Sequence, residues 1–346
     1  MDALAASLAR SPELFPHAWD VQSDAVTLVR LTKADYEAAS FLDERVIGPR
    51  TLARTLPFGQ LAAAVAAAGL PERSHFIFHM GHVGSTLLSR LLGAEGRLFG
   101  LREPAVLRTF AREPVGRAWS EAEREERLSV FLKLWSRTFE PDQTALIKAT
   151  SFVSDIAPRL LARPSPPKAL LLFVSPEAYM ATILAGPAAR KEAKTLVEER
   201  LKRLHRRIGR DVWQASSFSE GEALAAAWAT EMSALVEAKR VAGDRALPLD
   251  FDRFLENPHE QLARAFRHFD CDASDAKIAE LLAGPLMQRY SKAPEHAYSA
   301  ALRREHLDEA RKANSSEIAK GLAWLEAASK ELPIGEAISI ASRTSE

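Results

Sequence analysis

Short apolar runs alternate with stretches of helical periodicity over most of the chain. Four of the runs are continuous enough to be buried strands, and a stretch with apolar residues at helical spacing follows each one. Buried strands that alternate with helices are typical of a parallel sheet covered on both faces. The pattern predicts a three-layer α/β/α fold with a central, mainly parallel sheet, with strands at 75–80, 144–150, 168–174 and 246–251 and helices at 85–92, 154–162, 176–185 and 258–269.

The pattern also divides the chain into two parts. Residues 1–72 mix short apolar runs with charges and end in an alanine-rich helix that Gly69 and Pro71 should terminate. We expect this part to be a mainly helical extension, and 73–346 to be the α/β domain with a C-terminal helical or lid segment. Residues 187–210 are rich in Arg and Lys and predict one long helix with a solvated basic face.

The composition is that of an ordinary globular protein. Of the 346 residues 47% are hydrophobic, and 46 Lys and Arg balance 46 Asp and Glu. The overall charge therefore gives no reason to expect nucleic acid or a membrane as a partner. One cysteine, Cys271, excludes an internal disulfide, and the sequence shows neither a secretory leader nor a run of about 18 apolar residues. These features favour a cytoplasmic protein, and they leave the oligomeric state open.

The residues between the first strand and its helix have the character of an anion-binding loop. In "FHMGHVGSTLL", Gly81 and Gly84 allow positive φ and let backbone N–H groups approach an anion at the start of the helix. The Walker pattern G-x-x-x-x-G-K-S/T is not met, because Ser85 occupies the lysine position and His79 the first glycine position. This difference counts against a Mg²⁺-dependent ATP phosphotransferase.

The loop resembles instead the 5′-phosphosulfate loop of sulfotransferases, which runs roughly P-R/K-S-G-S/T-T before a leucine-rich helix. His82 and Val83 replace the basic residue and the serine of that pattern. A histidine can still donate a hydrogen bond and can carry charge. The resemblance implies a P-loop, sulfotransferase-like topology in which the 5′-phosphate of 3′-phosphoadenosine 5′-phosphosulfate is held by Gly81, His82, Val83, Gly84, Ser85 and Thr86, the last two as hydroxyl donors.

Two charged residues at the ends of strand-like runs are candidates for the chemistry. Glu103 precedes a proline and should be extended at a strand end. In tyrosylprotein-type and related sulfotransferases a glutamate at a similar distance from the loop is the general base, and the resemblance gives Glu103 that role; the plain alternative is an ion pair with a nearby arginine. Lys148 ends an apolar run and is expected either to hold the sulfonyl or bridging oxygens or to reach solvent.

A second stretch, 170–186, resembles the family's other nucleotide motif, a strand followed by R-D/S-P and a helix with a serine six residues after the proline. Pro176 matches, Thr182 takes the place of the serine, and Val174 stands at the arginine position. The resemblance implies that Ser175 and Thr182 contact the nucleotide. An ordinary helix start, with Ser175 at the N-cap and Pro176 at the first position, explains these two residues equally well.

The late strand and helix at 246–269 also resemble the family, with Asp252 expected as a helix cap rather than a catalytic acid. Near the C-terminus a basic, loop-like stretch could close over the nucleotide in place of the missing arginine or be simply exposed; its basic residues are Lys292, Arg303 and Arg304. His75 and His79 would lie roughly 13 Å apart on one face of a strand, too far to share a metal ion.

Together these features predict a sulfotransferase that moves a sulfuryl group from 3′-phosphoadenosine 5′-phosphosulfate to a hydroxyl or amine of a small-molecule, glycan or peptide acceptor. By the resemblance, Glu103 is the base, and His82 and Lys148 help the loop to stabilise the leaving phosphate. No metal is expected. A P-loop kinase or NTPase remains an alternative, as does a non-catalytic nucleotide-binding protein with a degraded site.

Overall fold

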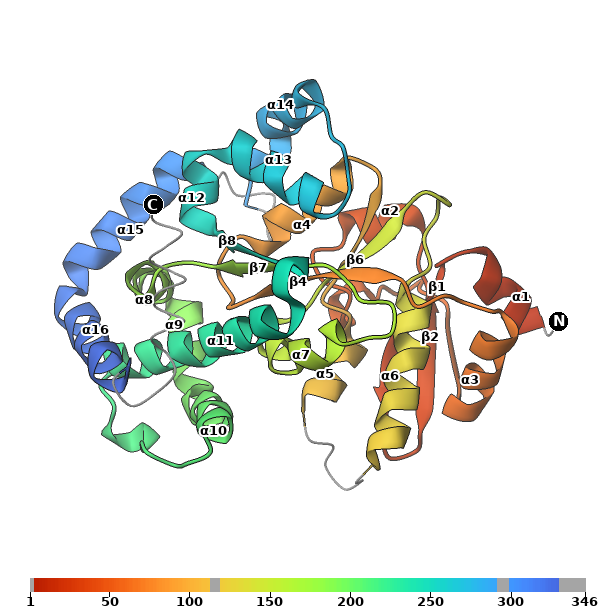
Figure 1. The fold of residues 1–346 in the computed structure, drawn as a ribbon, viewed down its shortest axis with the longest axis horizontal. Coiled ribbons are helices and arrows are strands. Elements are labelled where there is room, and N and C mark those ends of the chain that lie inside the picture. Colours follow the sequence, from red (N-terminus) through yellow and green to blue (C-terminus); the bar gives the residue numbers. More distant parts are fainter. Residues whose placement is uncertain (1–2, 113–118, 291–298, 330–346) are drawn as a thin grey trace.

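A five-stranded parallel sheet lies at the centre of the protein (Figure 1). The computed structural model describes residues 3–112, 119–290 and 299–329. The strand order is β5-β6-β4-β7-β8, so β4 lies in the middle of the sheet and β5 and β8 lie at its edges. The pairing is parallel throughout, and the strands are β4 (Ser74–His79), β5 (Leu98–Arg102), β6 (Thr144–Lys148), β7 (Ala169–Phe173) and β8 (Ala246–Asp250).

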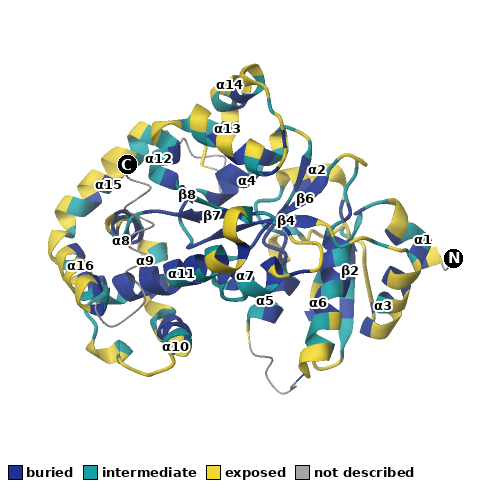
Figure 2. Ribbon diagram, in the orientation of Figure 1, coloured by how far each residue is buried: buried dark blue, intermediate teal, exposed yellow. Residues whose placement is uncertain are grey.

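Helices cover both faces of this sheet. On one face α4 (Ser85–Ala94) packs on β4, β5 and β6, beside α13 (Pro258–His268). On the other face α11 (Glu220–Ala242) crosses β4, β7 and β8 and packs against α7 (Ala157–Leu161). Every residue of β6 and β7 is buried, as the continuous apolar runs predict (Figure 2). The three-layer α/β/α fold predicted from the sequence is therefore confirmed.

The N-terminal part is richer in strands than the sequence predicts. Beside three helices it holds an antiparallel sheet in the order β1-β2-β3. The expectation of a mainly helical extension missed this sheet because Pro16 and a register shift between Pro16 and Ala18 interrupt the alternation of β1. The elements are α1 (Ala3–Arg10), β1 (Leu14–Asp20), β2 (Ala25–Arg30), α2 (Lys33–Ala38), β3 (Ala53–Pro57) and α3 (Phe58–Ala67).

An aromatic cluster joins the N-terminal sheet to the α/β core. Trp19 of β1 stacks on Trp119, with ring centroids 4.7 Å apart and planes 3° apart. It also contacts Phe110 of α5 (Ala105–Ala111) and Phe131 of α6 (Glu121–Trp135), at centroid distances of 5.4 and 5.3 Å. These rings belong to one continuous hydrophobic core, so the N-terminal part is packed onto the domain rather than tethered to it.

The predicted long basic helix at 187–210 is two helices, α9 (Pro187–Thr195) and α10 (Val197–Ile208), which meet at Leu196. Its basic face is also not wholly solvated. Arg203 is buried and bonds to Asp155, with an Nε to Oδ2 distance of 2.5 Å, and to Glu231 on α11, with an Nη1 to Oε1 distance of 2.7 Å. These carboxylates lie 48 and 28 residues away in the chain, so the helical pattern alone gave no sign of the burial.

The C-terminal helices pack on α8 (Pro176–Ala185) and α11. α15 (Ala300–Ala313) packs on α8, and α16 (Ser315–Ser329) crosses α11 where two glycines meet. A Cβ atom on Gly221 would lie 1.8 Å from the carbonyl oxygen of Glu317, so only glycine permits this approach. Two shorter helices, α12 (Phe251–Glu256) and α14 (Asp275–Ala283), flank α13. Within the described ranges, no helix has the length and apolar character needed to cross a membrane.

Candidate active site

The loop between β4 and α4 has the backbone of an anion-binding turn. Gly81, His82 and Gly84 have φ values of +86°, +55° and +68°. Gly84 is the N-cap of α4 and lies against the ring of Phe251, where a Cβ atom would come within 2.1 Å of two ring carbons. Both the positive φ and this close approach require glycine at position 84.

The start of α4 offers unused donors to an anion. Ser85 and Thr86 are both buried, and within the described residues no hydrogen bond takes up the hydroxyl of Thr86. The backbone N–H groups at the beginning of α4 also lack intrahelical acceptors, and they point out of the helix end together with its positive dipole. A buried hydroxyl without a partner costs free energy, so a bound phosphate oxygen at this helix start would satisfy it.

His79 fixes the loop, a role that the sequence did not reveal. Its Nδ1 accepts the N–H of Gly81 at 3.0 Å, so Nε2 carries the proton and donates to the carbonyl of Ala149 at 2.8 Å. The loop is thereby tied to the segment that follows β6. Val83 is buried, which explains why an apolar side chain occupies a position where the sulfotransferase pattern has a serine. His82 is partly exposed.

Glu103 and Lys148 form a buried ion pair beside this loop. The Lys148 ammonium donates to Oε1 of Glu103, and Lys148 is fully buried. Oε2 of Glu103 accepts from the hydroxyl of Thr150 at 3.1 Å and from Arg108 Nη2 at 3.4 Å. Because β5, β6 and β4 are neighbours, Glu103 lies two strands, roughly 10 Å, from the phosphate loop. The alternative that Glu103 pairs with a nearby arginine is borne out in part, because Arg108 is such a partner, but Glu103 is buried rather than at the surface. The alternative of a solvent-reaching Lys148 is wrong.

Glu103 is not extended, contrary to the expectation for a residue before proline. Its φ is +55°, a left-handed conformation that side chains other than glycine, asparagine and aspartate rarely adopt. Its N–H donates to the carbonyl of Lys148 at 2.7 Å, and α5 begins immediately after it, so the backbone on both sides is held in place. A strained residue that carries a buried carboxylate at a sheet edge is characteristic of a functional site.

The N-terminal part supplies a second layer of charge to this site, which sequence reasoning missed. Asp43 is fully buried and accepts from Arg108 Nη2 at 2.8 Å and from Arg45 Nη2 at 2.5 Å. Burial acts to raise the pKa of Asp43, but the hydrogen bonds from Arg45 and Arg108 outweigh it and lower the pKa to about 2. Arg108 thus joins Asp43 to Glu103. The ring of Phe41 lies 5.4 Å from the Lys148 ammonium.

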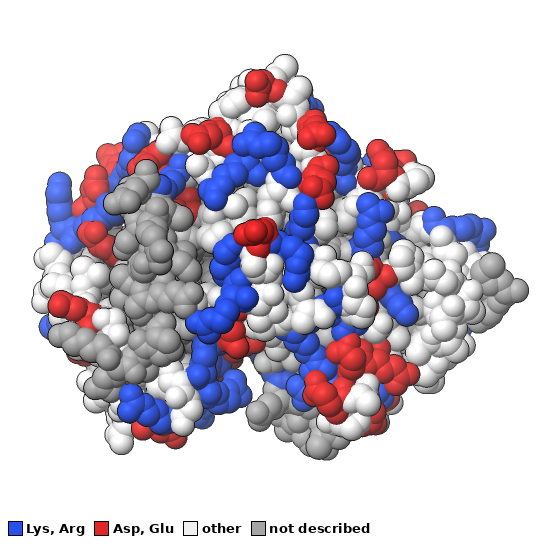
Figure 3. Space-filling model, viewed as in Figure 1, with Lys and Arg blue, Asp and Glu red and all other residues white. Residues whose placement is uncertain are grey.

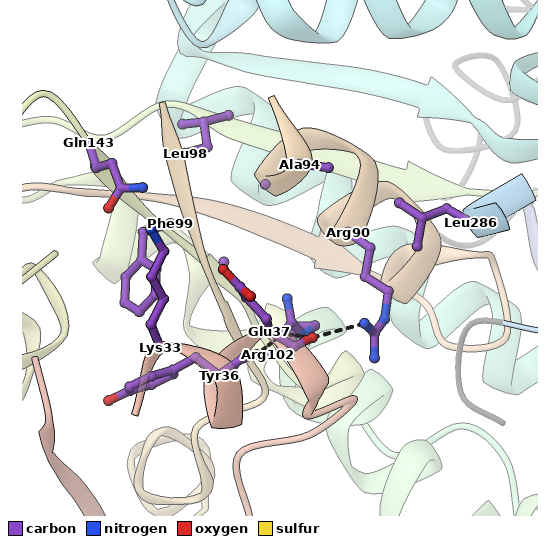
Figure 4. A pocket seen from close by; sticks show the side chains of 12 residues that line it. Lys33, Tyr36, Glu37, Arg90, Ala94, Leu98, Phe99, Arg102, Gln143 and Leu286 are labelled. Carbon is purple, nitrogen blue, oxygen red and sulfur yellow. Dashed lines mark hydrogen bonds between the residues drawn. The ribbon is translucent and has the colours of Figure 1, made fainter. Parts of the chain in front are cut away.

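Two arginines of the core hold the N-terminal segment in position (Figure 4). Arg102 donates to the carbonyls of Tyr36 and Ala39, and Arg90 donates to the carbonyl of Glu37 at 3.0 Å. Both cations therefore cap the C-terminal end of α2, where the helix dipole is negative. They border a cavity of about 240 Å³ between α2, α4 and β5. Because Asp43 follows shortly after the end of α2 in the chain, these hydrogen bonds help to fix the position of Asp43.

The second nucleotide motif has the geometry of an ordinary helix start. Ser175 accepts the N–H of Ala178 at 3.2 Å as the N-cap of α8, and the Thr182 hydroxyl donates to the carbonyl of Ala178 at 2.7 Å. Val174, at the position of the family's arginine, is buried, and its carbonyl accepts from Trp228 at 2.9 Å. The arginine of the family's motif therefore has no counterpart at position 174.

Arg303 of α15 lies close to the start of α4. Its guanidinium carbon lies 5.4 Å from the ring centroid of Phe251, the same ring that Gly84 contacts, and its Nη1 lies 2.6 Å from Oδ1 of Asp252. The expected cap role of Asp252 is wrong, because Asp250 caps α12 by accepting the N–H of Asp252 at 2.8 Å. Arg304 is exposed, and both arginines lie on a helix rather than in a loop. Lys292 lies outside the described residues.

Asp250, at the end of β8, is a weaker acid than an ordinary aspartate. Its low access to solvent raises the pKa to about 6, and the negative charge of Asp252 acts in the same direction.

Among the described residues no group of three or more His, Cys, Asp or Glu side chains has a metal-binding arrangement.

Three solved structures that resemble this chain are sulfotransferases. The sulfotransferase domain from the curacin biosynthetic pathway is 13% identical, with 73% of this chain and 97% of that one covered and a TM-score of 0.42. A sulfotransferase from Alicyclobacillus acidocaldarius is 15% identical, with 74% and 95% covered and a TM-score of 0.37. Sulfotransferase STF9 from Mycobacterium avium is 15% identical, with 90% and 96% covered and a TM-score of 0.36.

No family model matches the sequence, and no curated protein matches it. Because the identities and TM-scores of the solved structures are low, the case for an activity rests on the residues of this chain and their geometry.

Proposed function

We propose that this protein is a sulfotransferase that uses 3′-phosphoadenosine 5′-phosphosulfate as donor and a hydroxyl or amine as acceptor. The observation that carries the proposal is the partnerless, buried Thr86 hydroxyl at an anion-binding helix start, close to a buried Glu103–Lys148 pair. The first feature suits a phosphate. The second suits removal of a proton from an acceptor and stabilisation of negative charge nearby.

In this proposal the loop and α4 bind the donor through its 5′-phosphate. The N–H groups at the start of α4, with Ser85 and Thr86, hold the phosphate oxygens and stabilise the charge that develops when the bond to sulfur breaks. His82, whose partly exposed ring lies in the loop, adds a donor on the same side. Arg303 supplies the cation for the 3′-phosphate that Val174 does not.

Glu103 acts as the base toward the acceptor. Lys148 holds one of its carboxylate oxygens, and the other accepts two weaker, longer hydrogen bonds from Thr150 and Arg108. An acceptor hydroxyl can replace one of these and give its proton to Oε2 as its oxygen attacks sulfur in line. Lys148 and Arg108 keep the carboxylate oriented during this transfer.

Calorimetric titration with adenosine 3′,5′-bisphosphate, ADP, and ATP with Mg²⁺ tests the proposal without knowledge of the acceptor. A charged hydrogen bond is worth roughly 1.5–3 kcal/mol, so the bisphosphate should bind at least about tenfold more tightly than ADP. Arg303→Gln should remove this preference and leave ADP binding unchanged, whereas Arg304→Gln, on the adjacent exposed position, is the matched control.

Each other result has a definite meaning. Tighter binding of ATP with Mg²⁺ would replace the proposal with a kinase or NTPase. No binding by any of the three nucleotides would exclude the donor site at the loop, and a preference for the bisphosphate that survives in Arg303→Gln would assign the 3′-phosphate to a different cation.

A further inference from the structure

An arginine-lined cleft opens beyond the Glu103 site, and nothing described so far uses it. It lies between α5, α6, α10 and the 3₁₀ turn Ser151–Ile156, with a volume of about 410 Å³. Lysine and arginine side chains gather along the notch between α10 and the α5–α6 region in the space-filling view (Figure 3). The arginines that line the cleft are Arg112, Arg124, Arg203, Arg206 and Arg207.

Carboxylates neutralise only part of this charge. Asp155 accepts from both Arg203 and Arg207, at distances of 2.5–2.8 Å. Glu231 adds a second partner for Arg203, and Glu237 lies 3.3 Å from Arg207. Among the described residues, Arg112 and Arg124 take part in no ion pair. The ion pairs with Asp155 fix α10 against the turn after β6, so the cleft has a rigid wall.

Arg112 and Arg124 present the excess charge to the cleft. Arg112 is exposed, and its guanidinium carbon lies 4.8 Å from the centroid of the Phe152 ring. Arg124 is partly exposed, and its buried Nε has no hydrogen-bond partner within the described residues. Planar guanidinium groups with available donors match the oxygens of carboxylate, sulfate and phosphate groups.

The cleft is connected to Glu103 by α5. This helix starts at Ala105, directly after Glu103 and Pro104, and ends at Ala111, so it spans about 10 Å by the usual rise. Arg108 lies within α5 and Arg112 is its C-cap, and both reach the segment after β6, Arg108 at Thr150 and Arg112 at Phe152. One row of positive charge therefore leads from the proposed base to the cleft.

We propose that the cleft binds an anionic group of the acceptor, held about one α5 length from the hydroxyl or amine that Glu103 deprotonates. The inference rests on the proposed sulfotransferase function for the reacting end of the acceptor. It adds the chemical class: the acceptor is a hydroxy or amino compound with a remote carboxylate or phosphate. The anion replaces bulk counterions at Arg112 and Arg124, and no covalent step takes place in the cleft.

The test is a calorimetric titration of the full-length protein, first saturated with adenosine 3′,5′-bisphosphate so that the phosphate loop is filled. The probes are three matched series of graded chain length, ω-hydroxy carboxylates, ω-hydroxyalkyl phosphates and neutral α,ω-diols. We expect at least one anionic series to bind about tenfold or more tightly than the diols, with an optimum chain length. The series that binds more tightly distinguishes a carboxylate from a phosphate.

Arg112→Gln/Arg124→Gln should erase the preference for the anion and leave the binding of the diols and of the bisphosphate unchanged. Arg54→Gln, an exposed arginine of β3 far from the cleft in the chain, is the matched control, and each single variant serves if the double variant does not fold. Equal binding of anions and diols, or a preference that survives in Arg112→Gln/Arg124→Gln, overturns the inference. If the bisphosphate itself fails to bind, the proposed sulfotransferase function fails, whereas the response of the cleft variants to the anions still decides the cleft.

Discussion

At the scale of single residues, the carboxylate of Glu103 combines backbone strain, burial and a full set of hydrogen-bond donors. Glu103→Gln keeps the shape and removes the base. We expect kcat for sulfuryl transfer to fall by about 10²–10⁴-fold, the usual contribution of a general base, while the affinity for adenosine 3′,5′-bisphosphate stays unchanged.

Steady-state rates and calorimetry on the same preparations check this expectation. Glu126→Gln, on the exposed face of α6, is the control for the loss of one negative charge. Because the substitution also removes the counterion of buried Lys148, a thermal denaturation curve must accompany the kinetics. A folded Glu103→Gln protein with an undiminished rate would show that the proton leaves by another route.

Thr86 gives a prediction in which stability and function move in opposite directions. Its buried hydroxyl lacks a partner among the described residues, so Thr86→Val should raise the free energy of unfolding of the free protein by about 1 kcal/mol. The same change should weaken bisphosphate binding about tenfold, because a donor to the phosphate is lost. Denaturant unfolding and calorimetry measure the two effects.

Ser89 provides a matched comparison one turn along α4. Its hydroxyl is also buried without a partner in the described part of the chain. Ser89→Ala should therefore leave bisphosphate binding unchanged. If both substitutions weakened binding equally, the effect would come from the packing of α4 and not from a contact between Thr86 and phosphate.

Individual site residues could be predicted only where they follow a strand of the central sheet. Glu103 and Lys148 became candidates in this way, because the carboxyl ends of parallel strands meet at one edge, and both do lie at that edge. Asp43 was not, since its link to Glu103 runs through Arg108 and joins residues 65 positions apart in the chain. His79 was read as a departure from the Walker pattern, although its ring holds the loop to the end of β6.

At the scale of elements, the turn between β4 and α4 depends on Gly84. Gly84→Ala adds a Cβ that would lie 2.1 Å from the ring of Phe251 and forces alanine to a φ of +68°. The left-handed conformation alone costs about 1–2 kcal/mol, and the clash adds to it. We expect a clear fall in the melting temperature. We also expect a marked fall in the affinity for the bisphosphate, because the loop has to move.

Combination with Phe251→Ala separates the two causes. This second substitution removes the clash and leaves the positive φ, so Gly84→Ala/Phe251→Ala should bind the bisphosphate more tightly than Gly84→Ala alone. Phe251→Ala by itself gives the baseline for the lost aromatic packing. An unchanged affinity between the double and the single variant would mean that backbone strain, rather than contact with the ring, controls the loop.

The elements that a pattern predicts well are those whose burial is uniform. β6 and β7 are buried at every position, and their continuous apolar runs identified them. β1 has an irregular pattern of buried and exposed positions, a proline and a register shift, so its alternation was not recognisable. The break between α9 and α10 falls at Leu196, a residue without turn propensity; α9 packs mainly on α8, and α10 packs mainly on α11.

At the scale of the whole molecule, two partly buried groups should give the folding stability opposite dependences on pH. Burial lowers the pKa of His75 from 6.5 to about 4, and Lys168 acts in the same direction. As pH falls from 6.5 to 4 the unfolded chain binds this proton and the folded protein does not, so stability drops by about 3 kcal/mol. The pKa of Asp250 is raised to about 6, so the folded protein binds its proton first, and stability rises by about 3 kcal/mol as pH falls from 6 to 3.8.

These two contributions nearly cancel between pH 4 and 6, so removal of either should uncover the other. Asp250→Asn keeps the cap on α12 and removes the titration; its stability should exceed that of the natural protein at pH 7 and fall more steeply as the pH is lowered. His75→Asn, which retains an acceptor for the N–H of Lys168, should instead become relatively more stable toward pH 4. Urea unfolding at a series of pH values gives the slopes. Parallel curves for all three proteins would show that neither group changes its pKa on folding.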